Sequence, residues 1–293
     1  MSDAPADGAL APMRITDVHI HILPWRMLKA PVLATMRARL AEHWDLLESL
    51  SEDPTALLEI MDDAGVTRAG LVTDVSPNVM GMTDEANDFT MRYAQAAPDR
   101  LLPFGGVDPV TSPDAGRALE RLLDLGIRML KIHPPHMRCA ANAYTEGLDA
   151  LALLYKRCEA EGLPVMIHTG TSIFPGARSK FGNPMEIDDV AIDFPDLRIV
   201  MAHGGRPLYM NEAFFILRRH PNVWLDLSGI PPLRIPEYFP RLDEIAGKVL
   251  WGTDWPSPGV ATMRPNIEQF LGLPLRSDTK RAAMESNPER LLP

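Results

Sequence analysis

Two histidines near the start of the chain, His19 and His21, are separated by one residue in the segment Thr-Asp-Val-His-Ile-His. The segment alternates polar and apolar residues and is rich in β-branched side chains, which predicts a strand. Side chains at i and i+2 of a strand face the same side, so Asp17 is expected beside both histidines. Imidazole nitrogens and carboxylate oxygens bind zinc-like ions. Such a pair also occurs on ordinary exposed strands. The positions of the other histidines are therefore needed to support metal binding by this pair.

Eight segments with strand character alternate with helical patterns along the chain. They cover residues 14–20, 69–75, 101–107, 127–133, 164–168, 197–203, 222–228 and 248–254. Strands that alternate with helices indicate βαβ units and a parallel sheet. Eight units within 293 residues predict an α/β fold of the (β/α)8 TIM barrel type. A doubly wound sheet is the alternative, but the sequence lacks the glycine-rich phosphate loop that such a sheet would carry after an early strand.

The segment 24–51 is longer than an ordinary connection between a strand and a helix. Apolar residues at helical spacing across 32–50 predict a helical insertion after the first strand. Two roles remain open for it. The insertion would either make a subunit contact or form a lid that brings Trp25, Arg26 or Trp44 over a substrate.

The composition and net charge of the chain limit the kinds of partner and compartment that it fits. The chain is 46% hydrophobic, with a net charge of −10, which argues against nucleic acid and anionic membranes and leaves a small molecule as the expected partner. Residues 1–13, rich in Ala, Pro and Asp, predict a disordered tail before a single domain over 14–293. The two cysteines, Cys139 and Cys158, do not read as a disulfide framework. Without a signal peptide or a membrane span, a cytoplasmic protein is expected, and a homo-oligomer is left open.

Ligand-type residues recur at the same end of the predicted strands. They are His19, His21, His133, His168, His203 and Asp254, with His136 just beyond the fourth strand. The carboxyl ends of barrel strands converge on one mouth, where chemistry takes place. A core or capping role suits any one of these histidines, but not a set in which several apolar strands all switch to a polar residue at the same end. The set predicts a metal-centred active site.

The order of these motifs resembles the amidohydrolase superfamily. The motifs are His19-x-His21 after strand one, His168 after strand five, His203-Gly-Gly after strand six and Gly252-Thr-Asp254-Trp-Pro after strand eight. The chain is closer to the amidohydrolase-related branch, which includes aminocarboxymuconate-semialdehyde decarboxylase and γ-resorcylate decarboxylase. The resemblance extends from about residue 14 to the end. It is specific for the superfamily and not for a reaction.

The resemblance implies that His19, His21, His168 and Asp254 bind a metal and that His203 is the catalytic histidine. Three nitrogens and one carboxylate leave room on a divalent ion for a water molecule, whose pKa the metal lowers toward neutrality. Asp254 would also accept the proton of that water. We expect one ion, with zinc as the first choice and manganese as the alternative.

Lys131 on the fourth strand leaves the number of metal ions open. Some superfamily members carry a carboxylated lysine on this strand, bridging two metals. A free Lys131, with His133 on the same strand face, would instead bind a substrate carboxylate, and we favour this version with one metal. Arg206, directly after His203-Gly-Gly, is a candidate contact for an anion.

Three functions compete. The first is a metal-dependent hydrolase acting on a small, carboxylated molecule. The second is a non-oxidative decarboxylase or hydratase using the same site, and the third is a non-enzymatic barrel that binds a small ligand. Decarboxylases of the branch often have Glu two residues before the first metal histidine. The shorter Asp17 at that position favours hydrolysis.

Overall fold

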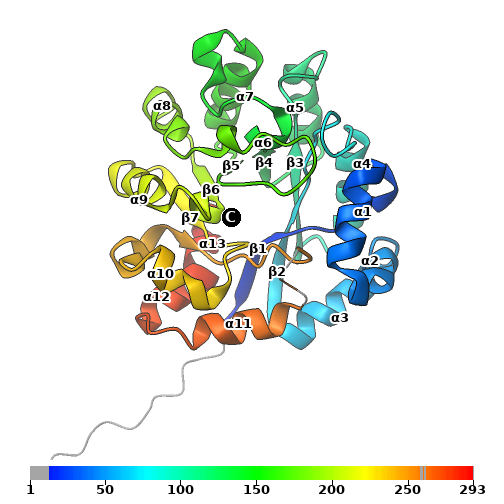
Figure 1. Cartoon of the computed structure of the whole chain (residues 1–293), viewed down its shortest axis with the longest axis vertical. Coiled ribbons are helices and arrows are strands. Elements are labelled where there is room, and N and C mark those ends of the chain that lie inside the picture. Colours follow the sequence, from blue (N-terminus) through cyan, green and yellow to red (C-terminus); the bar gives the residue numbers. More distant parts are fainter. Residues whose placement is uncertain (1–12, 258–259, 261, 293) are drawn as a thin grey trace, which may run out of the picture.

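The structure, a computed structural model, describes residues 13–257, 260 and 262–292. Eight parallel strands form one sheet in chain order: β1 Ile15–Ile20, β2 Val66–Val72, β3 Leu101–Gly106, β4 Met129–Ile132, β5 Val165–His168, β6 Ile199–Ala202, β7 Val223–Asp226 and β8 Val249–Leu250. Backbone hydrogen bonds from Val18 N to Trp251 O (3.0 Å) and from Asp254 N to His19 O (2.8 Å) bring the last strand back to the first. Figure 1 shows helices around this ring of strands. The predicted TIM barrel is confirmed.

The helices follow the strands as the pattern predicted. They are α1 Ala30–Arg39, α2 Trp44–Leu50, α3 Pro54–Ala64, α4 Glu85–Ala94, α5 Ala115–Asp124, α6 Pro134–Met137, α7 Asp149–Ala160, α8 Glu186–Asp193, α9 Met210–Arg219, α10 Ile235–Tyr238, α11 Met263–Leu271, α12 Ser277–Arg281 and α13 Asn287–Leu291. Helix α3 shows why the boundaries fall where they do. Asp53 caps its first turn by accepting from Thr55 N, and Gly65 ends it in the left-handed conformation.

Two apolar layers hold the barrel together. One lies between the strands and the surrounding helices, and the other is a separate cluster inside the ring that includes Leu102, Met166 and Trp224. Leu291 and Leu292 at the end of the chain join the inner cluster. The chemistry at the opposite, carboxyl end of the strands therefore rests on a filled core and not on an open pore.

The insertion after β1 is helical, as predicted, but it is not one helix. A 3-10 turn, Ala41–His43, separates α1 from α2. Trp25 is buried and donates its indole N–H to Leu47 O at 2.9 Å, which ties the start of the insertion to α2. Trp44 is also buried, whereas the side chain of Arg26 is 94% exposed. Of the three side chains that the lid role would bring over a substrate, only Trp25 lines the central cavity.

Strand β1 departs from simple alternation. Asp17 pairs with Ala69 and Ile20 with Leu71, so three steps on β1 face two on β2, which is a β-bulge. Val18 consequently packs in the inner cluster, and Asp17 turns to accept from Thr253 N (3.0 Å) and Thr253 Oγ1 (2.7 Å). The expectation that Asp17 shares a face with His19 and His21 was wrong. The expectation that residues i and i+2 face the same side assumes a uniform strand register. The bulge interrupts that register, and His19 lines the cavity whereas Asp17 does not.

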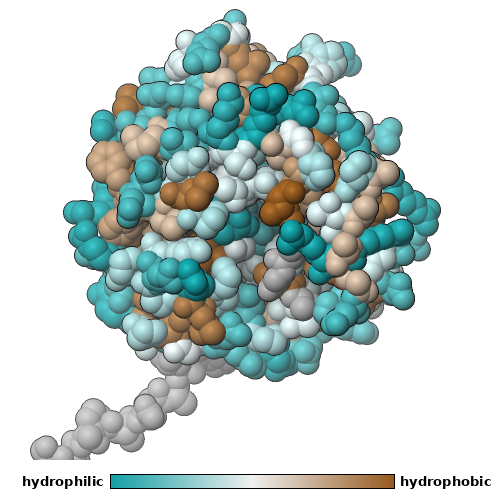
Figure 2. Space-filling model, viewed as in Figure 1, coloured by the Kyte–Doolittle hydropathy of each residue, from teal (hydrophilic) through white to brown (hydrophobic). Residues whose placement is uncertain are grey.

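Some predictions stay open. Residues 1–12 of the expected tail lie outside the described residues. Within the described part of the chain, no helix is long and apolar enough to cross a membrane. On the face drawn in Figure 2, hydrophobic side chains stand apart among hydrophilic ones, and a homo-oligomer remains a prediction.

The segment after β5 is held by a close crossing of two backbones. Gly170 has φ +90°, and a Cβ there would lie 2.1 Å from Arg206 O. Its N–H donates to Gly182 O at 2.7 Å. This crossing fixes the loop that follows His168 against the loop that follows His203, so both histidines depend on it.

Replacing Gly170 by alanine is therefore expected to lower the free energy of unfolding by at least about 2 kcal/mol, from backbone strain and the clash with Arg206 O. Urea unfolding measures it. Gly247→Ala is the matched control, because a Cβ at Gly247 meets nothing within 4 Å. The control is expected to change stability by less than about 0.5 kcal/mol. Equal changes in the two variants would contradict the crossing.

Candidate active site

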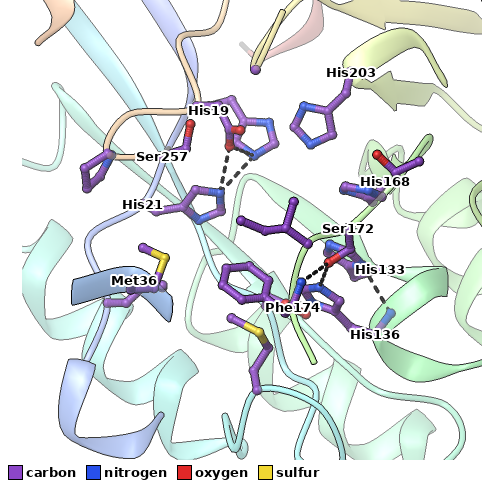
Figure 3. Close-up of a pocket in the computed structure, with 18 of the residues that line it drawn as sticks. His19, His21, Met36, His133, His136, His168, Ser172, Phe174, His203 and Ser257 are labelled. Carbon is purple, nitrogen blue, oxygen red and sulfur yellow. Dashed lines mark hydrogen bonds and ion pairs between the residues drawn. The ribbon is translucent and has the colours of Figure 1, made fainter. Parts of the chain in front are cut away.

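A cavity of about 360 Å³ opens at the carboxyl ends of the strands. Six histidines line it, together with residues of both charges: His19, His21, His133, His136, His168, His203, Asp74, Lys131, Arg206 and Asp254. Every residue predicted for the site is in this set. Figure 3 shows that the labelled histidines come from opposite sides of the cavity and point toward its centre.

His19, His21 and Asp254 meet with their ligand atoms facing one another. The two Nε2 atoms are 3.2 Å apart, and Asp254 Oδ1 lies 3.2 Å from His21 Nε2 and 3.5 Å from His19 Nε2. In each ring Nδ1 is the donor, because His19 Nδ1 lies 2.7 Å from Asp226 Oδ2 and His21 Nδ1 lies 3.1 Å from Val72 O, which assigns the tautomer with Nε2 as the ligand atom. Three lone pairs thus converge without a proton between them. The chemistry of this donor set fits a divalent cation.

Asp226 and Ser228 hold His19 from behind. Asp226 accepts from Ser228 N (2.9 Å) and Ser228 Oγ (2.7 Å) as well as from His19. Burial raises the pKa of Asp226 to about 7, and the hydrogen bonds from Ser228 oppose that rise. Burial also holds the pKa of His19 well below its usual value, so the ring is neutral. A carboxylate behind a ligating imidazole fixes its tautomer and its orientation.

His168, the last residue of β5, and His203, directly after β6, line the same cavity as this group. His168 Nε2 is buried without a hydrogen-bond partner in the described residues, which suits a ligand atom, although His168 lies outside the compact group of three. His203 Nδ1 donates to Ser228 O at 2.8 Å, which leaves Nε2 as an acceptor. Burial lowers the pKa of both histidines well below the usual value. Their rings pack edge to face with centroids 4.7 Å apart.

Asp254 and Arg206 form the charged rim of this group. Arg206 Nη2 lies 3.4 Å from Asp254 Oδ2, while its buried Nε has no hydrogen-bond partner among the described residues. Burial raises the pKa of Asp254, but the nearby imidazoles of His21 and His19 and the guanidinium of Arg206 outweigh burial and hold the pKa below its usual range. His203 and Asp254 both have φ +66°, an uncommon conformation that often marks functional sites.

Lys131 is buried in the cavity at 1% exposure. Burial lowers the pKa of Lys131 to about 8, and the charges of Asp226, Asp74 and Asp254 oppose that shift. A lysine with such a pKa is partly neutral near pH 8, the form that can be carboxylated. His133 does not reach the group of three: its ring is stacked between His136 (3.4 Å) and His168 (3.9 Å).

Several residues of the cavity had no role in the sequence analysis. They are Arg39 in α1, Asp74 after β2 and Ser172 after β5, and Asp226, which lies behind His19 and outside the cavity lining, was also missed. Asp74 is the next-to-last residue of the segment 69–75 predicted as a strand, so its position near the carboxyl end was a usable signal. Arg39 and Ser172 lie in an insertion and a loop, where no periodicity indicates which side chain faces the cavity.

The barrel and its histidine-lined mouth define a class of enzymes built around a metal site. The family model described as amidohydrolase matches residues 16–293, and the chain belongs to this family. The resemblance seen in the sequence is thereby confirmed. A comparison with curated proteins finds no match.

Three solved structures share the fold. A TIM-barrel protein from Bordetella bronchiseptica is 24% identical, with 96% of this chain and 98% of that chain covered and a TM-score of 0.76. A probable 2-pyrone-4,6-dicarboxylic acid hydrolase from Acinetobacter baumannii, with citric acid bound, is 16% identical over 96% and 99%, with a TM-score of 0.68. A 5-carboxyvanillate decarboxylase from Novosphingobium aromaticivorans, with manganese and a nitrobenzoic acid, is 17% identical over 96% and 95%, with a TM-score of 0.64. Likeness at this identity shows the fold alone.

Replacing Asp226 by asparagine tests the support behind His19. Loss of the carboxylate that orients the ring is expected to weaken zinc affinity by about 10- to 100-fold, measured by competition with a chelator. Asp108→Asn is the control, because Asp108 is equally buried but bonds Val110 N and Thr111 Oγ1 and no histidine. Zinc affinity that is unchanged in D226N, or equally weak in D108N, would contradict the assignment.

Proposed function

We propose that this protein is a metal-dependent hydrolase acting on a small, carboxylated molecule. The convergence of three unprotonated ligand atoms, from His19, His21 and Asp254, carries the proposal. His168, with its unpartnered Nε2, is the fourth proposed ligand. Bound there, one divalent ion, zinc or manganese, supplies Lewis acidity that polarises a carbonyl and lowers the pKa of a water molecule.

Asp254 and His203 carry out the two proton transfers of the proposed hydrolysis. Asp254 is ionised and is held by Arg206 through Oδ2, so it can accept the proton of the attacking water. His203 is neutral, with its proton on Nδ1 directed to Ser228 O. Its Nε2 therefore takes up a proton from solvent and delivers it to the leaving group, and the proton that Asp254 accepted from the water returns to solvent. Both side chains face the same cavity, so the two transfers serve one substrate.

Cations in the cavity support a carboxylated substrate. Lys131 and Arg206 line it from β4 and from the loop after β6, and Arg39 lines it from the insertion. The guanidinium of Arg206 offers a buried, unpartnered Nε to an anion. The names of two similar structures, a dicarboxylic acid hydrolase and a carboxyvanillate decarboxylase, agree with this class of substrate.

Decarboxylation at the same site is the second candidate, and the decarboxylase among the similar structures favours it. The position of Asp17 favours hydrolysis. Both of its oxygens accept hydrogen bonds, from Thr253 and from His19 N, and it is fully buried. The carboxylate of Asp17 is therefore occupied by hydrogen bonds from the backbone of β1 and from Thr253, and it is not available as a metal ligand.

Metal content and the fate of water test the proposal together. Protein purified without chelators is expected to hold about one equivalent of zinc or manganese, and its removal is expected to lower turnover at least about 100-fold until metal is restored. Small carboxylated lactones and esters are assayed in ¹⁸O-labelled water. One ¹⁸O atom in the product supports hydrolysis. Release of carbon dioxide without ¹⁸O uptake would establish the decarboxylase instead, and two metal equivalents would make Lys131 a carboxylated bridge.

Arg39 tests the role of the insertion in binding substrate. Arg39→Ala is expected to raise KM about 10-fold with little change in kcat, because a contact remote from the reacting atoms binds substrate and transition state alike. Arg37→Ala is the control on the same helix, because Arg37 pairs with Glu48 at 2.9 Å and lies over the ring of Trp44. Equal KM values in R39A and the unaltered protein would exclude Arg39 from substrate binding.

A further inference from the structure

Across the cavity from His19 and His21, Ser172 and His136 lie side by side (Figure 3), and Asp74 completes a hydrogen-bonded chain of three residues. Ser172 Oγ lies 2.8 Å from His136 Nε2, and His136 Nδ1 lies 2.5 Å from Asp74 Oδ2. The order hydroxyl, imidazole, carboxylate, with these two ring nitrogens, is that of a nucleophilic triad. None of the three belongs to the group proposed to bind the metal.

The three side chains come from different parts of the barrel. Asp74 follows β2, His136 lies in the short helix α6 after β4, and Ser172 follows β5. Asp74 and His136 are buried, at 6% and 2% exposure, while Ser172 is partly exposed and lines the cavity. The hydroxyl is therefore the member that a ligand meets, with the imidazole and carboxylate behind it.

The surroundings fix where the protons lie. Burial raises the pKa of Asp74, but the charge and hydrogen bond of His136 and the charge of Lys131 outweigh burial, and the pKa lies below its usual value. An ionised Asp74 accepts the Nδ1–H of His136, and in the tautomer with its one proton on Nδ1 the ring accepts at Nε2 from the hydroxyl of Ser172. The ring of His133 stacks on that of His136 at 3.4 Å, and burial lowers the pKa of His133, so it is neutral. A neutral ring against His136 tolerates an imidazolium there.

A second metal ion is the alternative occupant, since Asp74, His133 and His136 have ligand atoms within 4.8 Å of one another. The stacking argues against it. The two rings are within 8° of parallel, and the lone pairs of an imidazole lie in the plane of its ring. A single ion cannot lie in both planes, and both nitrogens of His136 already have partners.

We propose that Ser172 is a nucleophile, activated by His136 and Asp74, that accepts acyl groups from small esters without the metal. The hydroxyl oxygen bonds to the ester carbonyl carbon while its proton passes to His136 Nε2. The bond from that carbon to the alcohol oxygen then breaks, and the alcohol leaves with the proton from His136. Water hydrolyses the acyl-serine by the same route, regenerating the hydroxyl. This activity goes beyond the proposed metal-dependent hydrolysis and does not rest on it.

A fluorophosphonate probe tests it on the full-length protein as purified. Displacement of fluoride by Ser172 Oγ leaves a covalent phosphonate, which mass spectrometry of peptides locates. We expect labelling at Ser172 at an unchanged rate after metal removal. His136→Gln and Asp74→Asn are expected to slow labelling at least about 100-fold and about 10-fold, respectively. Ser172→Ala removes the label.

Ser257→Ala is the matched control, because Ser257 lines the same cavity on the side of His21 (Figure 3). Its labelling is expected to equal that of the unaltered protein, with Tm measured for every variant. Absence of label on Ser172 in the folded, unaltered protein would overturn the proposal. Labelling as fast in folded H136Q, or loss of a metal equivalent in that variant, would also overturn it. Metal content is a separate readout, so failure here is distinguishable from failure of the proposed function.

Discussion

Mutual repulsion between unprotonated ligand atoms is the constraint on which the site depends. The Nε2 lone pairs of His19 and His21 and an ionised Asp254 lie within 3.5 Å of one another, an arrangement that a positive charge between them stabilises. The fold holds this arrangement from outside. Asp226 and Val72 O accept hydrogen bonds from the Nδ1–H groups of the two rings. The crossing of the loops after β5 and β6 at Gly170 fixes His168 and His203. The rigid barrel core carries the strain of a positive φ at Asp254.

The barrel and the set of residues at its mouth could be predicted from sequence because one rule governs both. Parallel strands in a closed barrel end at the same face, so polar residues after apolar strands must meet there. That reasoning placed His168 and His203 beside His19 across more than a hundred residues of sequence. It carries no information on distance, and so it did not separate the compact group of three from His168.

Local irregularities could not be predicted. The bulge in β1 separates Asp17 from His19 although alternation joins them, because the register depends on pairing with β2 and on the hydrogen bonds to Thr253. The break between α1 and α2 likewise depends on packing, since helical spacing continues through it. Loops are harder still. Ser172 reaches the cavity only because the chain around Gly170 turns at positive φ, and a sequence pattern does not give that direction.

The histidines of the cavity form a continuous series of ring contacts, and their charges explain how two reactive groups can share it. Centroid distances run 3.4 Å from His136 to His133, 3.9 Å on to His168, 4.7 Å to His203 and 5.0 Å to His19. Burial holds the pKa of the three inner members, His133, His168 and His203, well below the usual value, so they are neutral at rest. Among the described residues, carboxylates contact this series only at its two ends, Asp74 at one and Asp226 with Asp254 at the other. The carboxylates therefore stabilise positive charge at both ends of the series, as a cation at His19 and as a transient imidazolium at His136.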